Sequence, residues 1–256
     1  MSTLTVGPAD IVEDLDTIAL DELVADAALT TRVDRKYLVP VAHAGQLVRG
    51  LGPVGARVLR IDGHREFGYR SEYYDTADLD CFYDAGQRRR RRFKVRTRHY
   101  LDTDGSYLEV KTRGPRGLTV KDRVQHDGLG LDRFALAFIS DVLSRNSIEA
   151  PAELEQSLVN EYRRITLHLP GREAARVTLD SRLSFAAPSG ASVPPGLGGL
   201  MVVETKSGAV ASDADRILWR MGHRPIGLSK YGLGLLLTRP DLRHLKWHRV
   251  LQQLLG

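Results

Sequence analysis

The sequence predicts an α+β fold in which helices surround a large antiparallel sheet or barrel. The first observation is a series of short segments in which polar and apolar residues alternate, as they do in a strand with one buried face. The second is that helical patterns interrupt this series, so the chain is not all-β. The nine candidate strands span residues 32–39, 56–62, 66–75, 88–100, 106–113, 118–126, 160–168, 174–183 and 200–206.

Helical patterns occupy much of the remaining chain. Residues 1–31 begin as a tail and continue as a pattern rich in alanine and acid, which predicts one peripheral helix. Pro and Gly cluster in residues 186–199, which predicts an exposed loop. No internal repeat or clear linker is visible, so a single α+β domain is expected. The other helices are predicted at about 40–50, 131–145, 150–158, 212–222 and 240–255.

Composition excludes several classes of protein. The chain has 256 residues, of which 42% are hydrophobic and 27% are charged, as in an ordinary globular protein. A single cysteine, Cys81, cannot form an internal disulfide. No apolar run approaches 18 residues and no leader pattern is seen at the N-terminus. We therefore expect a cytoplasmic protein with no membrane segment of its own.

The net charge of +5 conceals an asymmetry. All seven charges before Arg32 are acidic, and the rest of the chain carries 37 basic against 25 acidic residues, a net charge of +12. Such a body indicates a polyanionic partner, which could be nucleic acid, an anionic membrane surface, a nucleotide or polyphosphate.

The most basic segment is RRRRRFKVRTR at 88–98, with eight basic residues in eleven positions. Successive side chains of a strand point to opposite faces. One face is then entirely cationic, with Phe93, Val95 and Thr97 on the other. A solvated strand or a nucleic-acid-binding arm is the simpler interpretation of such a run taken alone. The cationic face comprises Arg88, Arg90, Arg92, Lys94, Arg96 and Arg98.

Other candidate strands repeat this alternation, which favours a sheet with one systematically cationic face. If the sheet curls into a barrel, the apolar faces pack against helices and the charged faces line a lumen. Such a lumen must hold water, a metal or a polyanion, because a dry one would cost too much in desolvation and repulsion. Phosphate chains suit it, and its few carboxylates offer hard oxygen ligands for Mg²⁺ or Mn²⁺. The alternating sets are Arg32, Asp34 and Lys36; Tyr107, Glu109, Lys111 and Arg113; Lys121 and Arg123; Tyr162 and Arg164; Arg176, Thr178 and Asp180; Glu204 and Lys206.

An ordered set of motifs makes the chain recognisable over residues 32–237. The motifs are RVDRKYLV at 32–39, SEYYDT at 71–76, KVRTRHY at 94–100, YLEVKTR at 107–113, KDR at 121–123, NEYRR at 160–164, RVTLD at 176–180, VVETKSG at 202–208 and LSKYGLG at 228–234. With this set the chain resembles the polyphosphate polymerase (VTC) domain of the vacuolar transporter chaperone family, a branch of the triphosphate tunnel metalloenzymes. This resemblance divides the chain into an acidic segment at 1–31, a tunnel domain at 32–237 and a C-terminal helix at 238–256.

The resemblance implies an eight-stranded antiparallel β-barrel, or tunnel, that binds a nucleoside triphosphate and transfers its terminal phosphoryl group to a growing polyphosphate chain. Glu204 matches the family's metal-binding glutamate, and Ser229 lies beside Lys230. Tunnel enzymes in general carry an ExExK signature, where this chain has Arg32, Asp34 and Lys36 instead. The implied phosphate contacts are Lys36, Arg96, Arg98, Lys111, Tyr162, Arg164, Arg176 and Lys230, with Lys121 or Arg123. Strand parity adds Arg90, Arg92, Lys94, Glu109 and Lys206 as candidate substrate-binding residues.

The expected partners are ATP, inorganic polyphosphate and Mn²⁺ or Mg²⁺, with no nucleic acid. The chain contains no Walker A, GxSxG or HExxH motif. A tunnel triphosphatase is the first alternative, with Glu109 orienting a water, and a polyphosphate- or inositol-phosphate-binding module without activity is the second. RNA binding is disfavoured because Phe93 alone is a poor stacking platform. Export of the product would require a separate membrane protein. The acidic N-terminal segment either plugs the basic tunnel or packs as a structural helix.

Overall fold

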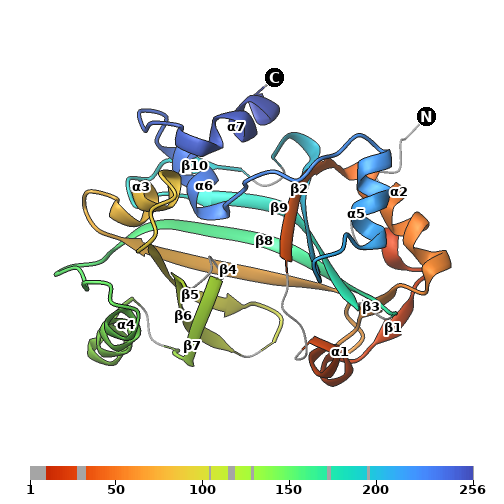
Figure 1. Ribbon diagram of the computed structural model, residues 1–256, viewed down its shortest axis with the longest axis horizontal. Coiled ribbons are helices and arrows are strands. Elements are labelled where there is room, and N and C mark those ends of the chain that lie inside the picture. Colours follow the sequence, from red (N-terminus) through yellow and green to blue (C-terminus); the bar gives the residue numbers. More distant parts are fainter. Residues whose placement is uncertain are drawn as a thin grey trace. The chain divides into compact units, whose positions relative to one another are not determined.

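The computed structural model confirms the α+β class and shows a large antiparallel sheet with helices packed on it (Figure 1). The structure describes residues 10–27, 33–103, 105–114, 119–127, 130–171, 174–194 and 197–255. Arg32 of the first motif and most of the N-terminal tail lie outside these ranges. All the other candidate site residues lie within them.

The sheet differs from the expected eight-stranded barrel in closure and in strand count. Its main path runs β2-β11-β9-β8-β4-β5-β6-β7, so β2 and β7 end the path and the sheet is open over the described residues. Three short strands join it off this path, and β1 pairs with β3 in parallel. Alternation predicts which side chains share a face, but closure depends on strand tilt and register, which alternation does not encode. The strands are β1 (Asp16–Ile18), β2 (Val33–Pro40), β3 (Arg57–Leu59), β4 (Glu66–Asp75), β5 (Phe93–Tyr100), β6 (Ser106–Arg113), β7 (Thr119–Gln125), β8 (Glu155–Leu169), β9 (Ala175–Ala186), β10 (Ser192–Val193) and β11 (Leu200–Ser207).

The helices confirm most of the predicted helical segments and correct others. Two helices, α3 and α6, were not predicted, and the helix predicted at 150–158 is wrong because β8 begins at Glu155. The strand predicted at 88–100 begins only at Phe93. Arg88 has a φ of 63°, a left-handed conformation that a continuous strand does not contain. The helices are α1 (Leu20–Ala27), α2 (Val41–Leu51), α3 (Asp80–Gly86), α4 (Arg133–Arg145), α5 (Asp213–Arg220), α6 (Lys230–Thr238) and α7 (His248–Leu255).

The chain forms two compact units, whose boundaries fall within β4, β8 and β9. Unit 1 contains β2, β11 and most of β9, with the C-terminal half of β8. Unit 2 contains most of β4, all of β5, β6 and β7, and the N-terminal half of β8.

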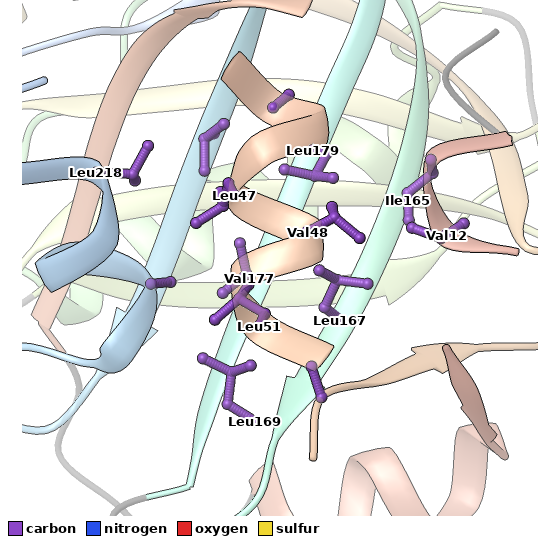
Figure 2. Close-up of a cluster of buried hydrophobic side chains, with 14 of the residues drawn as sticks. Val12, Leu47, Val48, Leu51, Ile165, Leu167, Leu169, Val177, Leu179 and Leu218 are labelled. Atoms are coloured by element: carbon purple, nitrogen blue, oxygen red, sulfur yellow. The ribbon is translucent and has the colours of Figure 1, made fainter. Parts of the chain in front are cut away.

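The core of unit 1 lies between α2 and one face of the sheet (Figure 2). Leu47, Val48 and Leu51 of α2 are buried in the same cluster as Leu167 of β8 and Leu179 of β9. These strand residues alternate with the charged residues of β8, β9 and β11, which therefore lie on the opposite face. Burial of the apolar face against α2 thus fixes the direction of the charged side chains.

A buried carboxylate ties α5 to the two strands β2 and β11. Asp215 accepts hydrogen bonds from Tyr37 Oη at 2.7 Å and Thr205 Oγ1 at 2.6 Å, and it also forms the capping box of α5 with Ser212. Tyr37 and Thr205 follow Lys36 and Glu204 directly in the chain. Their side chains point away from the charged face, so this network holds the backbone that presents Lys36 and Glu204.

Unit 2 repeats the same arrangement with different helices. Val95 and Val110 are fully buried on one face of β5 and β6, and α4 contacts β6. Helices α3 and α6 lie side by side (Figure 1), and α6 is buried along most of its length. The opposite face of β5 and β6 carries the charged residues of the candidate site in unit 2.

Candidate functional site

Glu204 is the centre of the charged face in unit 1. Its register partners are Lys36 on β2 and Thr178 on β9, and its Oε1 lies 2.6 Å from Lys206 Nζ. The same ammonium group lies 3.0 Å from Asp34 Oδ2. Burial alone would raise the pKa of the Glu204 carboxyl, but the charges of Lys36, Lys206 and Arg164 together outweigh burial and hold that pKa well below its usual range. Glu204 is therefore ionised at neutral pH.

The two arginines of this face that were predicted to contact phosphate are held by protein groups. Arg164 forms a bidentate ion pair with the fully buried Asp180, in which Nε donates to Oδ1 at 2.6 Å and Nη2 donates to Oδ2 at 2.8 Å. Its guanidinium lies 5.2 Å from the centre of the Tyr162 ring. Arg176 Nη2 donates to the carbonyl oxygen of Leu23 in α1 at 2.9 Å. Asp180, considered as an oxygen ligand for a metal, is instead the counter-ion of Arg164.

Glu109 is the centre of the charged face in unit 2. It is 1% exposed, and its Oε2 accepts from Arg96 Nε at 2.8 Å while Lys121 Nζ lies 3.5 Å from Oε1. Arg96 is itself only 9% exposed. Burial would raise the pKa of the Glu109 carboxyl, but the charges of Arg96, Arg98, Lys111 and Lys121 outweigh burial and lower it. The buried carboxylate therefore orients two cations and leaves the face cationic overall.

Lysines from both neighbouring strands extend this face beyond Glu109. Lys111 on β6 is the register partner of Lys94 on β5 and Lys121 on β7. Lys94 Nζ donates to Ser229 Oγ at 2.8 Å, and Ser229 caps α6 by accepting from Gly232 N at 3.2 Å. Like charges at adjacent register positions repel, which an anion between them would relieve.

The motif around Ser229 is also tied to the end of β4. Tyr231 donates to Asp75, which accepts backbone hydrogen bonds from Cys81 and Phe82 at the start of α3 as well. Asp75, the last residue of β4, is fully buried and has a structural role. Lys230, the first residue of α6, is half-buried.

The remaining candidate residues lie at the margins of the face. Arg90 is exposed and Arg92 half-buried in the segment between α3 and β5, so strand parity does not apply to them. Arg92 donates to the carbonyl oxygen of Arg89. Arg123 on β7 is exposed, and its guanidinium lies 5.0 Å from the ring centre of Tyr107.

Tyrosine rings accompany the cations, a feature that sequence reasoning largely missed. Strand parity placed only Tyr107 and Tyr162 among the charged residues. Counting parity along β4 as well would have found Tyr69 and Tyr73, which are register partners of Tyr100 and Arg96. The distances from cation to ring centre are 5.6 Å for Lys94 and Tyr231, 5.9 Å for Arg96 and Tyr73, and 5.5 Å for Arg98 and Tyr69.

The described side chains do not build a metal site by themselves. Across the described ranges no three His, Cys, Asp or Glu side chains are grouped so that they could hold an ion. Glu204 offers a single carboxylate. The nearby carboxylate of Asp34 is paired, like Glu204 itself, with the ammonium group of Lys206. Mg²⁺ is often bound by one or two carboxylates together with substrate phosphates. The Glu204 carboxylate therefore fits a metal whose other ligands come from the phosphates of the substrate.

Among the helices of the described part of the chain, none has the length and apolar character needed to cross a membrane.

Comparison with known proteins identifies a family. The model of the VTC domain family matches residues 28–238. No curated protein matches the chain. Solved structures that resemble it include a candidate adenylate cyclase from Bacillus halodurans, at 15% identity over 78% of this chain and 94% of that one, with a TM-score of 0.47.

Two further solved structures resemble the chain. One is from Hippeastrum, a candidate adenylyl cyclase described as having a dominant triphosphatase activity, at 15% identity over 84% and 99% of the two chains, with a TM-score of 0.44. The other, from Pyrococcus horikoshii, has 13% identity over 80% and 98%, with a TM-score of 0.42. The family assignment rests on the family model, which covers most of the sequence. The protein belongs to the VTC domain family.

Proposed function

We propose that this protein is a metal-dependent polyphosphate polymerase that transfers the γ-phosphoryl group of ATP to the end of an inorganic polyphosphate chain. The observation that carries the proposal is the charged sheet face of each unit, where cations outnumber carboxylates and surround a glutamate, which is Glu204 in unit 1 and the buried Glu109 in unit 2. Membership of the VTC domain family supports it.

The proposed reaction needs positioning and charge neutralisation rather than a strong base. An oxygen of the terminal phosphate of the chain attacks the γ-phosphorus of ATP, the bond from that phosphorus to the β–γ bridging oxygen breaks, and ADP leaves. The attacking oxygen is already anionic, so no proton has to be removed. Phosphoryl transfer of this kind is accelerated mainly by cations placed around the transferring group.

The proposed roles follow the two faces. In unit 1, Glu204 would hold the metal, and Lys36, Lys206, Arg164, Arg176 and Tyr162 contact phosphates. A divalent ion held there would supply positive charge that neutralises part of the phosphate charge. In unit 2, Glu109 orients cations that contact phosphates. Arg90 and Arg92 attract the polyphosphate chain from outside this face. The proposed unit 2 contacts are Lys94, Arg96, Arg98, Lys111, Lys121, Ser229 and Lys230. Of the alternatives Lys121 and Arg123, Lys121 is the proposed contact because its ammonium group lies 3.5 Å from Glu109.

The proposal predicts that purified protein given ATP with Mn²⁺ or Mg²⁺ forms polyphosphate and ADP together. Lys111→Ala should reduce the rate by at least about tenfold, since one charge-assisted phosphate contact contributes about 1.5–3 kcal/mol. Polyphosphate gels and ADP assays measure the two products. Arg133→Ala, at an exposed position at the start of α4, is the matched control and should leave the rate unchanged.

Two other outcomes would redirect the assignment. Orthophosphate and ADP without polymer would indicate a triphosphatase, for which the buried carboxylate of Glu109 offers an acceptor to orient water. Tight polyphosphate binding without turnover would indicate a binding module. Either result contradicts the polymerase proposal.

A further inference from the structure

Three tyrosine rings gather at one end of the charged face of unit 2. Tyr69 and Tyr100 are register partners on β4 and β5, with ring centres 5.1 Å apart. Tyr107 on β6 lies edge-on to Tyr100 at 5.9 Å. All three side chains are half-buried, so they retain surface accessible to solvent. They form an aromatic cluster at the β5–β6 hairpin.

Two arginines lie against this aromatic cluster. The Arg98 guanidinium is 5.5 Å from the ring centre of Tyr69, and that of Arg123 is 5.0 Å from the ring centre of Tyr107. Arg123 is exposed and makes no hydrogen bond or ion pair with the described residues, although it is the register partner of Glu109. Glu109 is engaged by Arg96 and Lys121 instead. The planar Arg123 guanidinium therefore lies on an aromatic ring with its donors available.

The same sheet face thus changes character along its length. The aromatic cluster occupies the Tyr107 end, and Glu109, Lys111 and their cationic neighbours follow on the same side of β6. Tyr107 and Lys111 are four residues apart, a distance of about 13 Å along a strand. An extended nucleoside triphosphate has the same order of groups, with an aromatic base at one end and the terminal phosphate at the other.

We infer that the aromatic cluster, with Arg123, is the base subsite for the nucleotide donor. This inference rests on the proposed function and adds a direction to it. The base stacks at the Tyr107 end, on a tyrosine ring or on the Arg123 guanidinium, both of which present flat surfaces to a nucleobase. The triphosphate then extends along β6 towards Glu109 and Lys111. The γ-phosphate is presented at the lysine-rich end, where Lys94 and Lys121 flank Lys111.

The alternative is that the three rings only stabilise the hairpin by cross-strand packing. The two roles differ in which ligand they affect. A base subsite contributes to ATP binding but not to the binding of inorganic tripolyphosphate, which has phosphates and no base. A packing role affects both ligands through the fold, or neither.

The test is calorimetric titration of the full chain with ATP and with tripolyphosphate, each with Mg²⁺. Tyr107→Leu should weaken ATP binding by at least about fivefold, the lower end of what stacking on one aromatic side chain contributes. Tripolyphosphate binding should stay unchanged. Tyr107→Phe, which keeps the ring, should retain wild-type affinity for ATP, whereas Lys111→Ala should weaken both ligands. The control Tyr83→Leu, on α3 and outside the aromatic cluster, should change neither.

An equal effect of Tyr107→Leu on both ligands, or no effect on either, overturns the base subsite. Arg123→Gln provides a second variant at an exposed position, and it should also weaken ATP binding selectively. Failure of wild-type protein to bind ATP contradicts both the base subsite and the polymerase. ATP binding with the predicted selectivity but without polymer formation contradicts the polymerase alone.

Discussion

Replacing Glu204 with glutamine is expected to lower kcat for polyphosphate formation by about 100-fold or more, the usual cost of removing one preorganised electrostatic group from a site. Glutamine keeps the size of the side chain but removes the negative charge that Lys36, Lys206 and Arg164 share. It also removes the single carboxylate proposed to hold the metal with the phosphates. Initial rates at saturating ATP and metal measure the effect.

The affinity of Glu204→Gln for polyphosphate is the second quantity to measure. Loss of a negative charge from a cationic face should leave polyphosphate affinity unchanged or increased, because Coulomb repulsion between the carboxylate and the chain is removed. Glu149→Gln, at an exposed position beyond α4, is the control and should retain full activity. A Glu204→Gln enzyme with wild-type kcat would exclude Glu204 from the reaction.

Replacing Glu109 with leucine is expected to destabilise the protein by about 3–5 kcal/mol, the usual cost of breaking a buried ion pair by removing one partner. Arg96 is 9% exposed, and without Glu109 its charge is left among Arg98, Lys111 and Lys121. Glu109→Gln should cost less because the amide oxygen can still accept from Arg96. Urea unfolding followed by circular dichroism measures the difference in the free energy of unfolding.

The pH dependence of unfolding separates the charge of Glu109 from its packing. The pKa of Glu109 is lower in the folded protein than the ordinary value near 4.5. The stability it contributes is therefore present above that ordinary pKa and is lost as the pH falls towards the folded pKa. The stability difference between wild type and Glu109→Gln should shrink on acidification below about pH 5. A difference that does not change with pH would contradict the ion-pair account.

Strand alternation predicted the charged face where an apolar face opposes it. Lys94, Arg96 and Arg98 alternate with buried Phe93, Val95 and Thr97, so their common direction could be predicted from the sequence. Residues 88–92 lack such apolar partners, and parity therefore failed there. Without an apolar face to bury, nothing fixes a strand, and the chain turns after α3 instead.

Contacts between residues distant in sequence could not be predicted in this way. The partner of Arg176 is the carbonyl oxygen of Leu23, a backbone atom 153 residues away. Lys94 meets Ser229 because α6 folds beside α3, and neither helix was predicted. The aromatic cluster likewise requires the pairing of β4 with β5, which sets Tyr69 against Tyr100. Local sequence patterns predict which face of a strand a side chain lies on. Strand pairing and helix packing determine which side chains come into contact.

The most direct test of the account is the fate of the γ-phosphoryl group. Wild-type protein is incubated with ATP labelled at the γ-phosphorus, a short polyphosphate primer and Mn²⁺, and label is separated into polymer and orthophosphate fractions. Label is expected to enter the polymer in step with ADP release, and Glu204→Gln is expected to slow this transfer by about 100-fold or more. Label recovered as orthophosphate, with no labelled polymer at any primer concentration, would contradict it.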